Sequence, residues 1–359
     1  MDLIRIDVGS PPATYPVEIG EGLAATLARH LDALGVGRRR VVVSTLPIWR
    51  FVGDRLGLGR VDPIFVPDGE RFKQLPNVVR IYDALIKAGV DRASVVVAVG
   101  GGVVGDTAGF AAATFLRGLS LVHVPTTLLA QVDSAIGGKV GVNHPLGKNL
   151  IGAFHRPRAV VVDPTLLGTL PRREFRAGLY EVVKYGVIAS EAIVERLERD
   201  LRRVFAREPD VLVPLIADCC GIKARVVTSD EREAGERRIL NFGHTAGHAL
   251  EAITRYRRFR HGEAVGYGML VASKIAEARG LVPPAFHERL ARLIARMGPL
   301  PAVADLSARH ALEAMRLDKK VIEGRLHYVL PVAMGQTTIV DDVTEKELGR
   351  ALGAIGLTR

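Results

Sequence analysis

Three histidines in one short stretch of the chain have a spacing that suits metal ligands. His244 and His248 lie four residues apart, so a helix would place both imidazoles on one face. His261 follows in the motif HGE and can reach the same point if the chain turns back. Imidazole pairs at this spacing, joined by a distant third ligand, commonly bind a divalent metal. The stretch therefore predicts a metal site, with ordinary core or surface histidines as the alternative.

Glycines around these histidines favour the metal-site interpretation. Five of them occur in the two segments NFGHTAGHA (241–249) and HGEAVGYG (261–268). Glycine destabilises a helix interior, so its repeated use needs a reason. We expect that the missing side chains allow neighbouring backbones to approach closely at this site.

Glu181 and Lys184 form a candidate buried ion pair. They lie three residues apart in GLYEVVKYG (178–186), so a helix would place them on the same face. An exposed ion pair is the alternative. The neighbouring residues are apolar, however, and we expect the pair to face inward, where an unpaired charge would be costly. Because catalytic zinc often takes a carboxylate and leaves one position open, Glu181 is a candidate ligand.

A glycine-rich turn in the first half of the chain could hold a nucleotide. The segment 93–115 runs from an apolar strand through glycines into an alanine-rich helix, and Gly100, Gly102 and Gly105 fit the pattern GxGxxG. Such a turn lets the backbone and the helix N-terminus approach a pyrophosphate. The acidic residue expected about 20 positions later is missing, and Asp106 follows the last glycine directly. We therefore expect a dinucleotide bound in a variant manner, with a ligand-free glycine turn as the alternative.

Two further segments are predicted to be ligand-binding loops. DGERFK (68–73) follows a strand and contains Glu70 and Lys73. The segment 124–157 is too rich in Gly, Thr, Asn and Lys to suggest a core element. Its lysines, Lys139 and Lys148, are expected to bind anionic oxygens.

The elements that must position these residues follow two different patterns. Short β-branched runs alternate with amphipathic stretches in the first half, which predicts βαβ units and a parallel sheet. The predicted strands are 38–45, 62–67, 93–100 and 120–125, with a helix over 75–89. A last such run, 158–171, precedes a helical pattern over 172–316, and an extended pair comes at 325–331 and 337–342. We predict an α/β fold with two domains, 1–170 and a mainly helical 171–359.

Composition limits the possible partners and the cellular location. The 359 residues carry a formal net charge of +10, but acidic residues are interleaved with the arginines, and no zinc-finger or RNA-recognition pattern occurs. We therefore do not expect a nucleic-acid partner. No apolar run approaches the roughly 20 residues that span a bilayer, and the first residues do not form a signal peptide. Cys219 and Cys220 are neighbours in an apolar helical pattern and suggest no disulfide framework. We expect a cytoplasmic protein without a membrane partner.

The motifs taken together resemble those of the 3-dehydroquinate synthase family, within the sugar-phosphate cyclase superfamily. The resemblance rests on GGGVVGD, VPTTLLAQVDSAIGGKVGVNHPLGKNLIGAFHRP, GLYEVVKYG, LNFGHTAGHALE and HGEAVGYGM, and it extends from DGERFK to DKK (318–320). It implies a Rossmann-like nucleotide-binding N-terminal domain, a mainly α-helical metal-binding C-terminal domain, and usually a homodimer. The cofactors implied are NAD and a divalent metal, zinc or cobalt. The activity implied is that of a lyase of the shikimate pathway to chorismate and the aromatic amino acids. It converts a sugar-acid phosphate, 3-deoxy-D-arabino-heptulosonate 7-phosphate, to 3-dehydroquinate and phosphate.

The resemblance also implies a role for individual residues. It gives the metal ligands as Glu181, His244 and His261, which moves His248 from the metal to the substrate. The implied NAD contacts are Asp68, Glu70, Lys73, Gly101, Gly102, Val103, Val104, Gly105, Asp106, Thr126, Thr127, Lys139, Lys148 and Thr169. The implied substrate-binding or catalytic residues are Asp133, Lys139, Lys148, Asn149, Lys184, Lys223, Arg237, Asn241 and His248, with Arg117 supplied to the partner subunit. Either Lys319 or Lys320 is expected to join Arg117.

Three other functions are the alternatives. A cyclase that makes 2-deoxy-scyllo-inosose or a valiolone would handle a substrate without the carboxylate. The residues implied for the dehydroquinate type, Lys148, Asn149, Arg237, Asn241 and His248, disfavour that alternative. A metal-dependent polyol dehydrogenase would consume NAD in proportion to product, whereas the cyclase would not. A basic nucleic-acid-binding module would show an affinity that falls steeply with salt.

Overall fold

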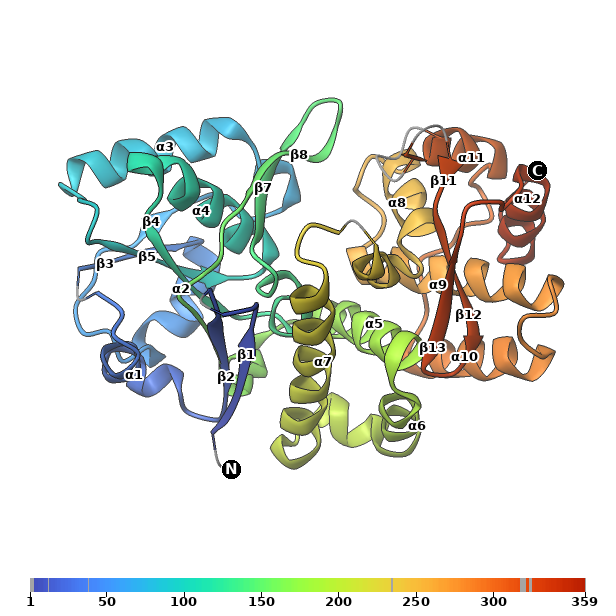
Figure 1. Ribbon diagram of the computed structural model, residues 1–359, viewed down its shortest axis with the longest axis horizontal. Helices are drawn as coiled ribbons and strands as arrows, with labels where there is room; N and C mark the ends of the chain where they lie inside the picture. The colour runs from blue at the N-terminus through green and yellow to red at the C-terminus, as the bar shows by residue number, and fades with distance from the viewer. Residues whose placement is uncertain are drawn as a thin grey trace. The chain divides into compact units, whose positions relative to one another are not determined.

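The chain folds into two compact units (Figure 1). The computed structural model describes all residues except 1–2, 12, 38, 234, 317–320, 323–324 and 359. The first unit comprises Met1–Phe175 and Arg207–Thr228, and the second comprises Arg176–Ala206 and Ser229–Arg359. None of the helices in the described part of the chain is long and apolar enough to cross a membrane.

A seven-stranded sheet forms the centre of the first unit. Its strands are β1 (Ile4–Val8), β2 (Tyr15–Ile19), β3 (Arg40–Ser44), β4 (Ile64–Phe65), β5 (Val95–Gly100), β6 (Ser120–Pro125) and β9 (Ala159–Val162). They lie in the order β1-β2-β9-β6-β5-β3-β4. Every neighbouring pair is parallel except the edge pair β1 and β2, which is antiparallel.

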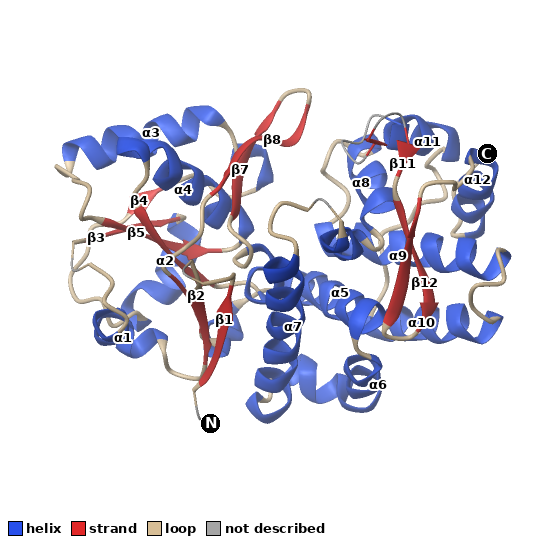
Figure 2. Cartoon of the chain, viewed as in Figure 1, coloured by secondary structure: helices blue, strands red, loops and turns tan. Residues whose placement is uncertain are grey.

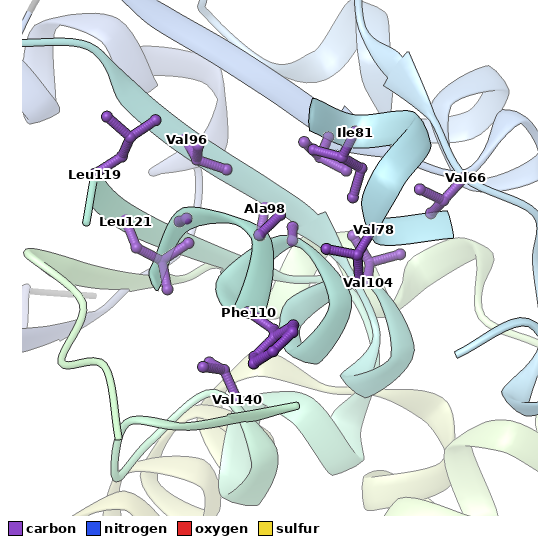
Figure 3. Packing of buried hydrophobic residues seen from close by; sticks show 14 of the residues in the cluster. Val66, Val78, Ile81, Val96, Ala98, Val104, Phe110, Leu119, Leu121 and Val140 are labelled. Atoms are coloured by element: carbon purple, nitrogen blue, oxygen red, sulfur yellow. The ribbon is translucent and has the colours of Figure 1, made fainter. Parts of the chain in front are cut away.

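The sheet is buried on both faces, which explains its almost continuous apolar strands. Successive side chains of β5 point to opposite faces. Val96 and Ala98 pack in one hydrophobic cluster with Val104 and Phe110 of α4 (Figure 3). The alternate residues of β5 pack in a second cluster with α1 and α2 on the other face.

Helices and a hairpin surround this sheet. The α-helices of the first unit are α1 (Leu27–Ala33), α2 (Leu46–Val52), α3 (Leu75–Lys87), α4 (Gly102–Thr114) and α7 (Pro209–Ser229). Short 3-10 turns are η1 (Ala24–Thr26), η2 (Gly53–Arg55), η3 (Glu70–Phe72), η4 (Phe115–Arg117) and η6 (Pro164–Thr169), and η5 (Ala130–Ser134) is a π-helical turn. The hairpin consists of β7 (Lys139–His144) and β8 (Gly147–Phe154).

The second unit is mainly helical (Figure 2). Its α-helices are α5 (Arg172–Ala189, which begins in the first unit), α6 (Glu191–Ala206), α8 (His244–Ile253), α9 (His261–Ala278), α10 (Pro284–Met297), α11 (Ala308–Arg316) and α12 (Glu345–Ala354). A 3-10 turn, η7 (Glu236–Asn241), precedes α8. Two antiparallel strand pairs complete the unit, β10 (Val321–Ile322) with β11 (Arg325–Leu326), and β12 (Tyr328–Ala333) with β13 (Gln336–Val340).

The predicted α/β architecture is confirmed, with two differences in detail. The segment 124–157 was expected to be loop, but it contains β7 and β8, whose Val140 and Val142 lie in the core. The predicted division at residue 170 also differs from the observed units, because 207–228 belongs to the first one. Contacts to that unit explain this, since the thiol of Cys220 donates to the carbonyl of Gln131 at 3.3 Å.

Candidate metal and nucleotide sites

Three side chains predicted as metal ligands converge in the second unit. They come from three helices, Glu181 from α5, His244 from α8 and His261 from α9. The Nε2 atoms of His244 and His261 each lie 3.6 Å from the same carboxylate oxygen, Oε1 of Glu181. Ligands that share one tetrahedral zinc ion at about 2.1 Å lie about 3.4 Å apart. The observed spacing therefore fits a shared metal ion.

The hydrogen bonds of the two histidines turn the same nitrogen toward Glu181. Nδ1 of His244 lies 3.1 Å from the carbonyl oxygen of Phe242, and Nδ1 of His261 lies 3.3 Å from Oε2 of Glu251. A carbonyl and an ionised carboxylate can only accept a hydrogen bond, so each Nδ1 is the donor. The lone pair is then on Nε2, which is the nitrogen that faces Glu181.

Glu181 is a buried carboxylate with two differently placed oxygens. The side chain is fully buried, and Oε1 has no hydrogen-bond partner among the described residues. Oε2 lies 2.5 Å from Nζ of Lys184, so the predicted inward-facing ion pair is present. Oε1 is turned instead to the two histidines. A buried oxygen of this kind, beside two imidazole nitrogens, suits zinc or cobalt.

His248 belongs to the same cluster. One ring nitrogen from each of His244, His248 and His261 lies within 4.8 Å of the other two, an arrangement that could itself hold a metal ion. The ring of His248 is 5.5 Å from that of His244 and 5.7 Å from that of His261, centroid to centroid. The structure therefore brings all four candidate residues together. They allow two ligand sets, either Glu181 with His244 and His261 or the three histidines alone.

The glycines near the histidines allow the helices to approach one another, as predicted. A Cβ on Gly262 would lie 1.9 Å from the carbonyl oxygen of Ala177 on α5. A Cβ on Gly268 would lie 1.7 Å from the carbonyl oxygen of Gly243. Real Cβ atoms essentially never come within 3.0 Å of another atom in this way, so only glycine fits. The close approach of α5, α8 and α9 brings Glu181, His244 and His261 to one point.

Two more predicted substrate residues of the second unit lie in the segment that leads into α8. Arg237 is buried, and its guanidinium donates to the carbonyl of Glu231 at 2.5 Å. The side-chain amide of Asn241 donates to Oε1 of Glu233 at 2.7 Å. Both side chains are therefore held in place by local contacts.

The glycine-rich turn in the first unit joins β5 to α4. The first residue of α4 is Gly102, and no side chain caps the helix N-terminus at Gly101. The amides there can donate to an anionic ligand. A Cβ on Gly101 would lie 3.0 Å from the side chain of Thr127. A small cavity beside this turn is lined by Gly100, Gly101, Gly105, His123, Pro125 and Ser134, among other residues. These features suit the predicted dinucleotide.

A polar network connects the turn with the β7–β8 hairpin. The ammonium group of Lys73 donates to Asp106 and, at 2.6 Å, to Oδ1 of Asn149. Burial lowers the pKa of Lys73, but the charges of Asp106 and Glu70 outweigh it, so that the pKa is raised. Lys148 Nζ lies 3.9 Å from Oε1 of Glu70. The network gathers five residues that the family resemblance had assigned to NAD or substrate.

Asp133 and Lys223 form the second polar pair of the first unit. Lys223 Nζ donates to the carbonyl oxygen of Asp133 at 2.6 Å and to its Oδ1 at 2.7 Å. Asp133 lies in the π-helical turn η5, a conformation that often marks a functional site. Lys223 and Cys220 lie on one face of α7, and both contact carbonyls of this turn. The pair was predicted as two separate residues, and their contact is visible only in the structure.

The remaining predicted residues lie elsewhere in the first unit. Asp68, Arg117, Lys139 and Thr169 are exposed, and Thr126 is buried directly after β6. Lys319 and Lys320 lie outside the described residues. Sequence reasoning missed Glu251, although it follows His244 and His248 on the same face of α8 and the pattern HxxxHxxE could have revealed it.

Profiles of one known family match most of the chain. The profile of the 3-dehydroquinate synthase N-terminal domain matches residues 63–177, and that of the C-terminal domain matches 178–321. A 3-dehydroquinate synthase from Nostoc sp. (strain PCC 7120 / SAG 25.82 / UTEX 2576) is 44% identical over 97% of this chain and 98% of its own.

Solved structures with the same fold include two other sugar-phosphate cyclases. The first is a 2-epi-5-epi-valiolone synthase from Streptomyces hygroscopicus subsp. jinggangensis 5008 with NAD+ and Zn2+ bound, at a TM-score of 0.87 and 28% identity, covering 97% of this chain and 98% of its own. The second is a 2-deoxy-scyllo-inosose synthase complexed with carbaglucose-6-phosphate, NAD+ and Co2+, at a TM-score of 0.85 and 27% identity, covering 97% and 99%. The resemblance predicted from the motifs is confirmed. The chain belongs to the 3-dehydroquinate synthase family.

Proposed function

We propose that this protein converts 3-deoxy-D-arabino-heptulosonate 7-phosphate to 3-dehydroquinate and phosphate, with NAD and a divalent metal as cofactors. The relative at 44% identity over almost the whole chain favours this reaction over those of the two cyclases of known structure, at 28% and 27%. Those two proteins were solved with NAD+ and with Zn2+ or Co2+, which supports the same cofactors here.

The observation that carries the proposal is the convergence of Glu181, His244 and His261. Two Nε2 atoms face one buried carboxylate oxygen at 3.6 Å, and the other oxygen of that carboxylate is paired with Lys184. We infer that these three residues hold the metal and that His248 contacts the substrate. The pairing with Lys184 supports this division, because it engages Oε2 and leaves Oε1 turned to the histidines.

The first unit supplies the residues proposed to hold NAD. The N-terminus of α4 offers backbone amides to the pyrophosphate, and Lys73 keeps Asp106 in a fixed position beside it. When bound, NAD supplies reversible hydride transfer at a substrate alcohol, and the metal supplies Lewis-acid stabilisation of substrate oxygens. Net redox change over the reaction is nil.

We propose that cationic residues hold and orient the substrate through its two anionic groups, the carboxylate and the phosphate. Lysine and arginine bind carboxylate and phosphate oxygens by charge-assisted hydrogen bonds. Lys223 is held by Asp133 through two contacts, so its ammonium group does not have to be ordered when substrate binds. We propose that Lys148 and Asn149 in the first unit, and Arg237 and Asn241 in the second, also contact substrate.

A phosphate-release assay tests the proposed reaction. Purified protein with zinc or cobalt and trace NAD is given the heptulosonate phosphate, and phosphate and NADH absorbance are followed together. We expect many phosphates released per NAD, with no net NADH. Steady accumulation of NADH would indicate a dehydrogenase, and an absence of phosphate release would refute the assignment. A substrate analogue that lacks the carboxylate should react poorly, which separates the proposed enzyme from the other cyclases.

Metal analysis of single variants distinguishes the two ligand sets. Glu181→Ala and His261→Ala should lose bound metal, whereas His248→Ala should keep the metal and lose turnover. Loss of metal in His248→Ala, together with full retention in Glu181→Ala, would instead assign the metal to the three histidines.

Four further predictions from the sequence complete the proposal. These are the division into an NAD-binding and a metal-binding domain, the homodimer with Arg117 acting in the partner subunit, the cytoplasmic location, and the lack of nucleic-acid and membrane partners.

A further inference from the structure

Glu251 is a buried carboxylate whose contact the proposed reaction does not use. It lies on α8 and is only 3% exposed. Its Oε2 is 3.3 Å from Nδ1 of His261, a residue on a different helix. A carboxylate is costly to bury unless it is well partnered, so the burial of Glu251 beside His261 needs an explanation.

The two proposed histidine ligands have different hydrogen-bond partners at Nδ1. His244 donates from Nδ1 to a neutral backbone carbonyl, that of Phe242, whereas His261 donates to the charged carboxylate of Glu251. A charged acceptor forms the stronger hydrogen bond and makes the opposite ring nitrogen a better electron donor. His261 is also the more exposed ring of the two, with 28% of its side chain accessible against 11% for His244. It therefore depends more on a side-chain partner for its orientation.

We propose that Glu251 is a positioning residue that fixes His261 as a metal ligand. Its carboxylate accepts the Nδ1 hydrogen, holds the ring with Nε2 turned to Glu181, and strengthens Nε2 as a donor to the metal. The inference rests on the proposed function, because it requires that the cluster bind a metal ion. It adds Glu251 to the site as a residue that supports one of the three proposed ligands.

Metal affinity of Glu251→Gln is the direct test. The glutamine has nearly the same shape, and its carbonyl oxygen can still accept from Nδ1, so that only the charge is removed. Partners of this kind typically change metal affinity by about 10- to 100-fold. We expect cobalt binding, measured by competition with a chelator, to weaken by about that factor. The visible absorption of the bound cobalt should also shift, because the ligand field of His261 changes. Glu251→Ala should bind at least as weakly.

A second glutamate of the same unit provides the matched control. Glu277 lies at the far end of α9, about 24 Å along the helix from His261, and pairs with Lys274. Glu277→Gln removes the same charge and should leave cobalt affinity and spectrum unchanged. The thermal stability of the metal-free proteins is measured alongside, since a purely structural role for Glu251 would lower it without affecting metal affinity.

The outcomes separate this inference from the proposed function. If the wild-type protein binds no cobalt, or if His261→Ala binds it normally, the proposed metal site itself is wrong. If the wild type and Glu251→Gln bind cobalt with equal affinity and identical spectra, the site stands and the role of Glu251 is refuted. Weaker binding in Glu251→Gln, but not in Glu277→Gln, supports it.

Discussion

The close contact between α5 and α9 makes Gly262→Ala a sharp test of how the metal site is assembled. Gly262 follows the proposed ligand His261, and Ala177 lies one helical turn before Glu181. The added Cβ would lie 1.9 Å from the carbonyl oxygen of Ala177, whereas an ordinary contact needs at least 3.4 Å. The two helices would therefore have to separate by about 1.5 Å.

That separation can be translated into two measurable losses. Overpacking of a tightly packed contact costs about 1–3 kcal/mol in the free energy of unfolding. The distance from Glu181 to His261 would also grow from 3.6 Å to about 5 Å, well beyond the roughly 0.2 Å tolerance of metal–ligand distances. We expect zinc affinity to fall more than about 100-fold, because one ligand can no longer reach the shared ion.

Chelator competition and denaturant unfolding of the metal-free protein measure the two effects. Gly353→Ala on α12 is the matched control, since a Cβ there would meet nothing within 4 Å. It should be neutral or stabilising by up to about 1 kcal/mol. Wild-type zinc affinity in Gly262→Ala would refute the view that helix proximity assembles the site.

Two further predictions concern buried titratable groups of the first unit. Burial, with a smaller effect of His155, lowers the pKa of His123 to about 4, so the folded protein takes up this proton only well below the unfolded value of 6.5. Its contribution to stability is present above pH 6.5 and is lost as the pH falls toward 4, by about 3 kcal/mol. His123→Gln should flatten this limb of the unfolding curve, and parallel curves for the two proteins would contradict the assignment. Lys73→Met should lower the free energy of unfolding of the NAD-free protein by about 3 kcal/mol, because it leaves the Asp106 carboxylate without its cation. Adding Asp106→Asn should recover much of that loss, and no recovery would show that the ion pair is not the cause.

Local patterns in the sequence were sufficient to predict most of the fold. The strands β3, β5 and β6 and helix α3 were predicted because a β-branched run or an amphipathic period is visible within a few residues. The hairpin β7–β8 was missed, since its glycines and lysines outweigh the alternating Val140 and Val142. The strands β1 and β2 were missed as well. Their place in the sheet comes from pairing with each other and with β9, which lies far along the chain.

The sequence by itself identified the candidate site residues, because motif composition and spacing are local properties. It identified the glycine turn, the inward Glu181–Lys184 pair and the His244–His248 face, and the five glycines predicted close backbone approach. Only the tertiary structure decided which of these side chains meet. Oε1 of Glu181 lies beside two histidines from other helices, Lys223 donates to Asp133, and the Glu251 carboxylate contacts His261. Such contacts depend on how helices cross, and the crossing is set by packing between segments that are distant in sequence.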